Sequence, residues 1–368
     1  MRKAGVPLID LTVSNPVEVF GDYPHSEIGR AYGNVKDFVY RPNPFGSRES
    51  RLAVARYYKR RNLAISPDQI LLTASTSEAY SLLFKLFCNA GDEILAPLPS
   101  YPLFEYLAAL ESVRFVPYSL AYDGSWYIDF DHLRQQISPR TRAVVVVNPN
   151  NPTGSFLKKF EAETLFDVAE ERGLPIISDE VFMDYPIGSG ADSFRTFIGQ
   201  DSVLSFSLNG LSKAAGMPQM KLAWIALNGP ERDRETARER LELLLDTYLS
   251  VGTPVQSALA ELLDIGESIQ EQIRFRTAQN MKSLQVLVEG SPLGCLHIEG
   301  GWSAILQLPT KLLEEELIAR LLEEQNVIVQ PGYFFDMASE NYLVVSLITP
   351  PDEFVEGIRR VHQLASSV

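Results

Sequence analysis

The sequence is poor in the residues on which several common kinds of protein depend. It has only two cysteines, Cys88 and Cys295, which excludes a disulfide framework and favours a reducing compartment. Its four histidines are widely spaced and form no H-E-x-x-H pattern, which argues against a zinc site or a histidine-based triad. No uncharged apolar run approaches the roughly 18 residues of a membrane helix, and none near the N-terminus suits a signal peptide. We therefore expect a soluble, cytoplasmic protein without a membrane partner.

Positive charge is also scarce. The chain of 368 residues carries 47 acidic and 33 basic side chains, a formal net charge of −14. A nucleic-acid-binding protein needs a basic face, so this balance argues against nucleic acid as a partner. The G-x-x-x-x-G-K-[ST] phosphate loop, the G-x-G-x-x-G turn and the G-x-S-x-G elbow are absent as well. Apolar residues make up 45% of the chain and charged residues 22%, a composition that can form a large core. The length is ordinary for a two-domain enzyme.

Short apolar runs alternate with amphipathic stretches through the middle of the chain. The runs are rich in Val, Ile and Leu with little polar alternation, as in strands of a sheet covered on both faces. We expect strands at residues 70–73, 93–96, 143–148, 175–178, 202–207 and 222–227. Helices are expected between them, at residues 78–89, 102–110, 156–172 and 230–249. This alternation predicts an α/β domain with a mostly parallel sheet covered by helices.

After about residue 253 the pattern changes. A long amphipathic stretch reaching residue 289 is followed by a helix at 310–324, a helix after Pro351, and strand-like segments at 296–308 and 342–348. We interpret this part as a smaller α+β domain that the N-terminal segment joins. The predicted organisation is a large domain at residues 40–252 and a small domain of residues 1–39 and 253–368.

Polar segments follow several predicted strands, at the places where open α/β sheets bind ligands. Residues 72–79, LTASTSEA, form a hydroxyl-rich turn between a strand and a helix, which suits a phosphate. An ordinary helix cap with a capping box at Ser75 and Glu78 explains the same residues. Residues 147–154, VNPNNPTG, form a rigid turn that could aim an asparagine amide inward, although loop punctuation is the simpler interpretation.

Two further segments carry charge. Asp179 ends a buried strand, and because a buried carboxylate is costly when unpaired, we expect a cationic or hydrogen-bonding partner for it. Lys213 lies in an otherwise apolar strand-to-turn region, followed by residues 217–222, MPQMKL. A solvated loop lysine is the ordinary explanation of such a residue. Each of the four signals is weak alone, whereas their order and spacing are specific.

That order resembles the class I/II aminotransferases, pyridoxal-phosphate-dependent enzymes of fold type I. The intervals are similar too: 28 residues separate Asn151 from Asp179, 34 separate Asp179 from Lys213, and 8 separate Lys213 from Lys221. The resemblance extends from residue 11 to residue 353. It implies the cofactor pyridoxal 5'-phosphate and a transfer of an amino group from an amino acid or amine to a 2-oxo acid. It also implies a homodimer and a biosynthetic role in amino acid metabolism.

The resemblance implies a role for each matching residue. Lys213 would form the Schiff base with the cofactor aldehyde and then carry the proton. Asp179 would pair with the pyridinium nitrogen, and Tyr101 would stack on the ring, so these two also count as catalytic. Asn151 would bond the phenolic oxygen of the ring. The phosphate would be held by Ser75, Thr76, Ser77, Lys221 and, from the neighbouring subunit, Tyr40.

Three cofactor-binding positions depart from the family pattern. Phe182 stands where the family usually has a tyrosine that bonds the phenolic oxygen. Lys221 replaces an arginine at the phosphate, so a point charge replaces a planar fork. Gly210 replaces a phosphate-binding serine or threonine. None of these changes removes the lysine and aspartate on which the chemistry depends.

A fourth departure concerns the substrate. Val344 stands where the family has the arginine that binds the substrate α-carboxylate. Either another arginine takes over, with Arg30 and Arg48 the nearest candidates, or the substrate is not an ordinary α-amino acid. The missing arginine also keeps a lyase or decarboxylase on the same scaffold as an alternative. A regulatory relative that only binds the cofactor is a second alternative, which the retained lysine, aspartate, asparagine and tyrosine disfavour.

Overall fold

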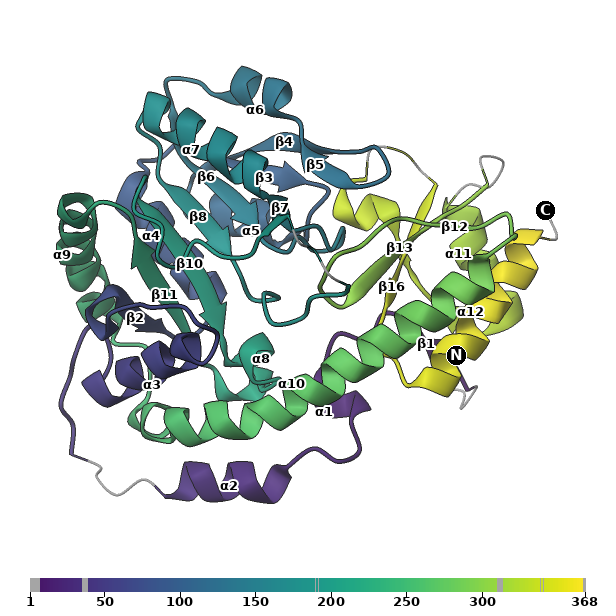
Figure 1. Cartoon of the computed structure of the whole chain (residues 1–368), viewed down its shortest axis with the longest axis horizontal. Helices are drawn as coiled ribbons and strands as arrows, with labels where there is room; N and C mark the ends of the chain where they lie inside the picture. The colour runs from purple at the N-terminus through teal and green to yellow at the C-terminus, as the bar shows by residue number, and fades with distance from the viewer. Residues whose placement is uncertain are drawn as a thin grey trace.

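A computed structural model gives the fold and describes residues 7–34, 39–188, 190, 192–309, 314–337, 339 and 341–366. Its dominant element is an eight-stranded sheet with the strand order β2-β11-β10-β8-β6-β3-β4-β5 (Figure 1). These strands are β2 (Ile70–Thr73), β3 (Glu93–Leu98), β4 (Arg114–Tyr122), β5 (Trp126–Ile128), β6 (Thr141–Val147), β8 (Ile176–Asp179), β10 (Ser205–Gly210) and β11 (Ala223–Asn228). Only β11 and the edge strand β5 run antiparallel to their neighbours, so the predicted, mostly parallel sheet is confirmed.

Helices cover both faces of this sheet, which explains the unbroken apolar strands. In β6, Val145 packs into one core with Leu82 of a covering helix, while Val144 and Val146 pack into another with Leu165. Successive side chains of a strand point to opposite faces, so the part of β6 that helices cover on both faces, residues 143–147, is apolar throughout. The covering helices include α4 (Thr76–Phe87), α5 (Leu103–Leu110) and α9 (Glu231–Tyr248) on one face, and α3 (Arg48–Lys59), α6 (Phe130–Gln136) and α7 (Lys159–Arg172) on the other.

A second, four-stranded antiparallel sheet lies to the right in Figure 1, with the order β12-β13-β16-β15. Its strands are β12 (Gly294–Cys295), β13 (Ser303–Gln307), β15 (Gln330–Pro331) and β16 (Tyr342–Ser346). The helices α11 (Glu314–Gln325) and α12 (Pro351–Ser366) cover one face of it. The N-terminal segment joins this part of the chain, since β1 (Ile9–Asp10) pairs in parallel with β14 (Val327–Ile328). The exact division into two domains stays a prediction.

The helix α10 (Thr253–Val288) links the two sheets. It has 36 residues, so it is about 54 Å long. In Figure 1 it runs obliquely from the side of α3 to the side of α12, and it contacts both of these helices as well as α2 (His25–Gly33). It also contacts α8 (Leu211–Ala214), a short turn of helix that follows β10. The amphipathic stretch expected to reach residue 289 is therefore one continuous helix.

Two expected elements differ in the structure. The strand-like segment 296–308 is broken, because β13 begins only at Ser303, after a loop in which Gly301 has a φ of +85°. A Cβ atom on Gly300 would lie 2.7 Å from the Phe156 ring and 3.0 Å from the Tyr185 carbonyl oxygen. This loop therefore packs tightly against the segments that carry Phe156 and Tyr185. The helix expected from residue 156 begins at Lys159, because β7 (Leu157–Lys158) pairs with β9 (Ser193–Phe194). The first residues of the helix expected at 310–324 lie outside the described residues.

Candidate active site

A cavity of about 340 Å³ opens at the carboxyl edge of the large sheet. Parallel strands end together at this edge, and the segments that follow them supply polar groups to a shared site. Asp179 ends β8, Asn151 follows β6, Thr76 starts the helix after β2, and Lys213 lies in α8 after β10; all four line the cavity. Tyr101 and Phe182 line it as well, so the structure brings six of the predicted residues together.

The other predicted residues do not line this cavity. Ser75 caps α4, with its Oγ accepting a hydrogen bond of 3.1 Å from the Glu78 backbone N–H, and Ser77 lies in the first turn of the same helix. Lys221 is exposed and has left-handed backbone torsions, with φ 51°. Tyr40 is 73% exposed. Their predicted contacts with a phosphate stay predictions.

Asp179 has the hydrogen-bonding partner that its burial requires. Its Oδ2 accepts a bond of 3.0 Å from the Tyr80 hydroxyl, and its Oδ1 accepts one of 3.2 Å from the Val181 backbone N–H. Burial raises the pKa of Asp179 to about 6, although both bonds and the charge of Lys213 act in the opposite direction. The sequence analysis missed Tyr80, although it lies four residues after Thr76 and hence on the same face of α4.

Lys213 is enclosed by aromatic rings. Its Nζ lies 4.4 Å from the ring centroid of Trp302 and 5.3 Å from that of Phe182. Burial lowers the pKa of Lys213 to about 8, and the charge of Asp179 opposes this shift. A substantial fraction of the amine is therefore neutral near pH 8, and a neutral amine is the form that attacks a carbonyl.

If Lys213 forms the Schiff base that the resemblance implies, its lowered pKa predicts how the cofactor-free protein takes up the cofactor's aldehyde. The rate of pyridoxal phosphate capture should rise with pH to a half-maximum near 8, far below the value of an ordinary lysine. In Asp179→Asn the midpoint should fall further, because the negative charge that holds the proton on Lys213 is lost. The pH dependence of the initial rate of the visible absorbance change measures both midpoints. A midpoint near 10 would show that Lys213 is an ordinary solvated lysine.

The backbone around Lys213 is fixed by hydrogen bonds from three separate elements. The Tyr185 hydroxyl donates to the Lys213 carbonyl oxygen at 2.5 Å, and the Tyr23 hydroxyl donates to the Gly216 carbonyl oxygen at 3.0 Å. The side chain of Gln270, on α10, donates to the Ala214 carbonyl oxygen and, at 2.9 Å, to Asp184 Oδ2. The turn that carries the lysine is therefore held on several sides.

The helix α10 also approaches this turn very closely. A Cβ atom added to Gly266 of α10 would lie 2.5 Å from the Ala215 Cβ and 2.7 Å from the Ala215 Cα. Gly266→Ala should therefore destabilise the protein by about 1–3 kcal/mol and displace the lysine turn. Gly29→Ala in α2 is the matched control, since no atom lies within 4 Å of that position and alanine favours helices. Urea unfolding of the two variants should move in opposite directions, and equal midpoints would contradict the close packing.

The structure gives a reason for the glycine at position 210. A Cβ there would lie 2.8 Å from the Ala223 Cβ and 3.0 Å from the Ala223 Cα, on the paired strand β11. A serine or threonine hydroxyl cannot be placed at this position unless the two strands move apart. The phosphate would therefore depend on other groups, such as the helix N-terminus of α4.

No arginine lines the cavity in the described part of the chain, where Lys213 is the only cationic lining residue. Val344 is buried in an apolar cluster that includes Ile305 and Phe335. Arg30 and Arg48, the two candidates named from the sequence, are exposed, and neither lines the cavity.

The described part of the chain has no group of three or more histidine, cysteine, aspartate and glutamate side chains that could hold a metal ion. Within the described ranges, no helix is long and apolar enough to cross a membrane.

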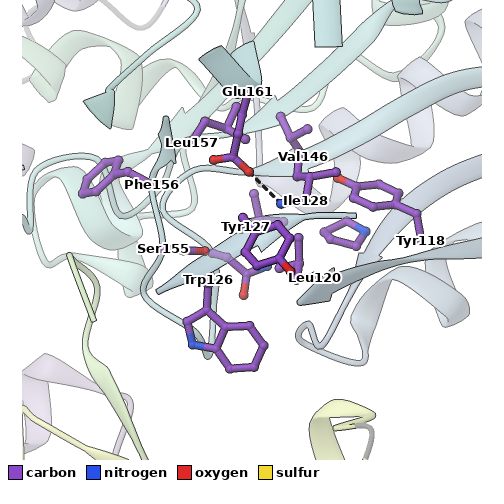
Figure 2. Close-up of a pocket in the computed structure, with 13 residues that line it drawn as sticks. Tyr118, Leu120, Trp126, Tyr127, Ile128, Val146, Ser155, Phe156, Leu157 and Glu161 are labelled. Atoms are coloured by element: carbon purple, nitrogen blue, oxygen red, sulfur yellow. Dashed lines mark hydrogen bonds between the residues drawn. The ribbon is translucent and has the colours of Figure 1, made fainter. Parts of the chain in front are cut away.

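A second cavity, beside β4 and β5, is much smaller (Figure 2). Its volume is about 20 Å³, room for about one water molecule. The Glu161 carboxylate at its edge accepts hydrogen bonds from the backbone N–H groups of Ile128 at 2.6 Å and Lys158 at 2.8 Å. Burial raises the pKa of Glu161, and these bonds act against the shift. Glu161 therefore ties β5 to the start of α7, and this cavity cannot admit a substrate.

Comparisons with known proteins agree with this geometry. The sequence profile of the family described as aminotransferase class I and II matches residues 36–360. The glutamate-pyruvate aminotransferase AlaA of Haemophilus influenzae is 24% identical over 375 residues, which cover 100% of this chain and 92% of that protein. A tyrosine aminotransferase of Dictyostelium discoideum is 27% identical over 371 residues, covering 96% of this chain and 88% of that protein. An alanine aminotransferase structure from Pyrococcus furiosus covers 100% of this chain and 94% of that one, with a TM-score of 0.87 and 26% identity. The chain belongs to the class I and II aminotransferase family, and it is a pyridoxal-phosphate-dependent enzyme of fold type I that transfers an amino group to a 2-oxo acid.

Proposed function

We propose that the 340 Å³ cavity is the site of amino-group transfer and that Lys213 is the residue that binds the cofactor covalently. The observation that carries this proposal is the pairing of a lysine, whose pKa is lowered to about 8, with a buried carboxylate across one cavity. Pyridoxal phosphate, when bound, supplies a ring that accepts the electrons left on the substrate carbon when its proton is removed. Lys213 then supplies the amine that takes up and returns this proton.

The polar groups of the cavity suit such a ring. With a pKa of about 6, Asp179 is mostly ionised at neutral pH, and its carboxylate can hold a proton on a ring nitrogen. Asn151 accepts a hydrogen bond of 3.3 Å from Ser303 through its Oδ1, which leaves its amide N–H groups to donate to the ring's phenolic oxygen. The buried Ser100 Oγ and Trp302 Nε1 have no hydrogen-bond partner within the described chain, and both residues line the cavity. Unsatisfied polar atoms on a cavity wall are expected where a polar ligand completes them.

The N-terminus of α4 suits the cofactor's phosphate. The first N–H groups of a helix have no partner inside the helix, and its dipole favours an anion there. Thr76 starts the helix beside the cavity, and the Ser75 hydroxyl still has a hydrogen to donate. We assign Ser77 and Lys221 to the same phosphate. We also assign to it the exposed Tyr40, supplied by the other subunit of a homodimer.

Reduction with borohydride tests this proposal directly. Reduction of the holoenzyme should fix the cofactor irreversibly to one lysine, and peptide mapping by mass spectrometry should find it on Lys213. An adduct on Lys221 or another lysine would overturn the assignment of every other site residue. The cytoplasmic location and the biosynthetic role stay predictions from the sequence.

A further inference from the structure

The four-stranded sheet presents a group of uncharged polar side chains to the cavity. Ser303 of β13 lies opposite Ser346 of β16, and Gln330 of β15 lies opposite Val344 of β16. Residues that face each other across antiparallel strands project to the same side, about 5 Å apart. Ser303, Ser346 and Gln330 all line the cavity, so Val344 projects to the cavity side with Gln330 directly beside it.

The opposite side of β16 confirms this orientation. Leu343 and Val345 pack into the core beneath α11 and α12, whereas Val344 packs with Phe335, which itself lines the cavity. Val344 offers no hydrogen-bond donor. Gln330 beside it is half-buried, and within the described chain its side-chain amide makes no hydrogen bond. An amide with two N–H groups and one oxygen is therefore free to meet a ligand where the family has a guanidinium.

An uncharged amide selects a different ligand from the one that an arginine selects. A carboxylate that enters the cavity loses water without meeting an arginine. The only cationic residue on the described wall is Lys213, which the proposed function assigns to the cofactor. A carboxamide or hydroxyl group exchanges its hydrogen bonds with water for bonds with Gln330 and Ser346 at little cost. The remaining wall includes several aromatic side chains, among them Tyr101, Phe104 and Phe334.

We propose that Gln330 determines specificity by binding the group on the substrate's α-carbon, and that this group is uncharged and hydrogen-bonding. The amino donor is then an aromatic or apolar amine that carries a carboxamide or alcohol in place of a free carboxylate. The 2-oxo acid acceptor uses the same cavity, so its carboxylate contributes little to its binding. This inference rests on the function proposed above, because it places the substrate in the cavity of Lys213.

Equilibrium binding of two unreactive probes to the holoenzyme tests the proposal. 3-Phenylpropanamide and 3-phenylpropanoate have the same size and no amino group, so calorimetric titration measures binding without turnover. The amide should bind at least about 10-fold more tightly than the carboxylate. Gln330→Leu should weaken amide binding by about 2- to 13-fold, as for the loss of one hydrogen bond, and leave carboxylate binding unchanged. Gln307→Leu is the matched control and should change neither value, because Gln307 is exposed on β13 and does not line the cavity.

A second variant keeps the test valid if Gln330→Leu folds poorly. Gln330→Glu preserves size and polarity but adds a negative charge, so it should weaken the carboxylate more than the amide. The proposal is overturned if wild type binds the carboxylate more tightly, or if both Gln330 variants leave the ratio of the two affinities unchanged. The borohydride adduct separates the two hypotheses: an adduct on Lys213 without amide preference rejects only this inference, whereas an adduct elsewhere rejects the proposed function.

Discussion

Lys213→Gln should reduce the rate of amino-group transfer by at least about 10⁴-fold, because in the proposed function Lys213 both attaches the cofactor covalently and moves the proton. Lys221→Gln should have a small effect. Lys221 is exposed, and a charge interaction at an exposed position contributes up to about 1 kcal/mol, which is about 5-fold in cofactor affinity. The two variants remove the same charge from lysines eight residues apart. Steady-state rates at saturating cofactor distinguish them.

The contrast between these lysines follows from their surroundings. Lys213 lies within 4.4 Å of the Trp302 ring centroid, and the Tyr185 hydroxyl holds its carbonyl oxygen, so its amine has a defined place in the cavity. Lys221 has no place in the lining of that cavity. If Lys221→Gln were the variant that lost activity, the spacing from which the site was predicted would be shifted by eight residues. Unfolding curves should show that both variants remain folded.

The parts of the fold that the sequence predicts are those with a local physical cause. Residues 70–73 form β2 as expected, because a strand buried on both faces needs an unbroken apolar run. The same holds for α10, whose buried face repeats at helical spacing over 36 residues. The loop between β12 and β13 was missed, because it is shaped by contacts of Gly300 with Phe156 and Tyr185 that no local pattern reveals.

The site divides in the same way. The meeting of Asp179 and Lys213 in one cavity could be predicted, because Asp179 ends one strand of a parallel sheet and Lys213 follows the neighbouring strand. Trp302 lies just before β13 and Gln330 lies in β15, both in the four-stranded sheet's part of the fold, and their place in the cavity depends on how the two sheets pack. Tyr80 is intermediate: helical spacing from Thr76 indicates its direction, but its bond to Asp179 requires the fold.

Val344→Arg should convert the cavity into one that favours a free carboxylate. An arginine binds a carboxylate through two charge-assisted hydrogen bonds, and valine offers none. Since Val344 projects to the same side as the cavity-lining Ser346, a longer side chain can extend its charged end toward the substrate. Wild type should gain little from the carboxylate when phenylalanine is compared with 2-phenylethylamine in the half-reaction. The variant should gain about 30-fold to several thousand-fold, the equivalent of 2–5 kcal/mol.

The same substitution should lower stability, because Val344 is packed among Trp126, Leu296, Ile305 and Phe335. Overpacking such a cluster costs about 1–3 kcal/mol, so the unfolding midpoint should fall while the carboxylate preference rises. Val344→Met is the matched control: it is longer than valine and uncharged, so it should lose stability without gaining preference. A gain of several hundred-fold already present in wild type would reject the argument. It would mean that an arginine beyond the described lining, for example one from a second subunit, reaches the substrate. That arginine would then bind the α-carboxylate in place of the arginine that the family pattern has at position 344.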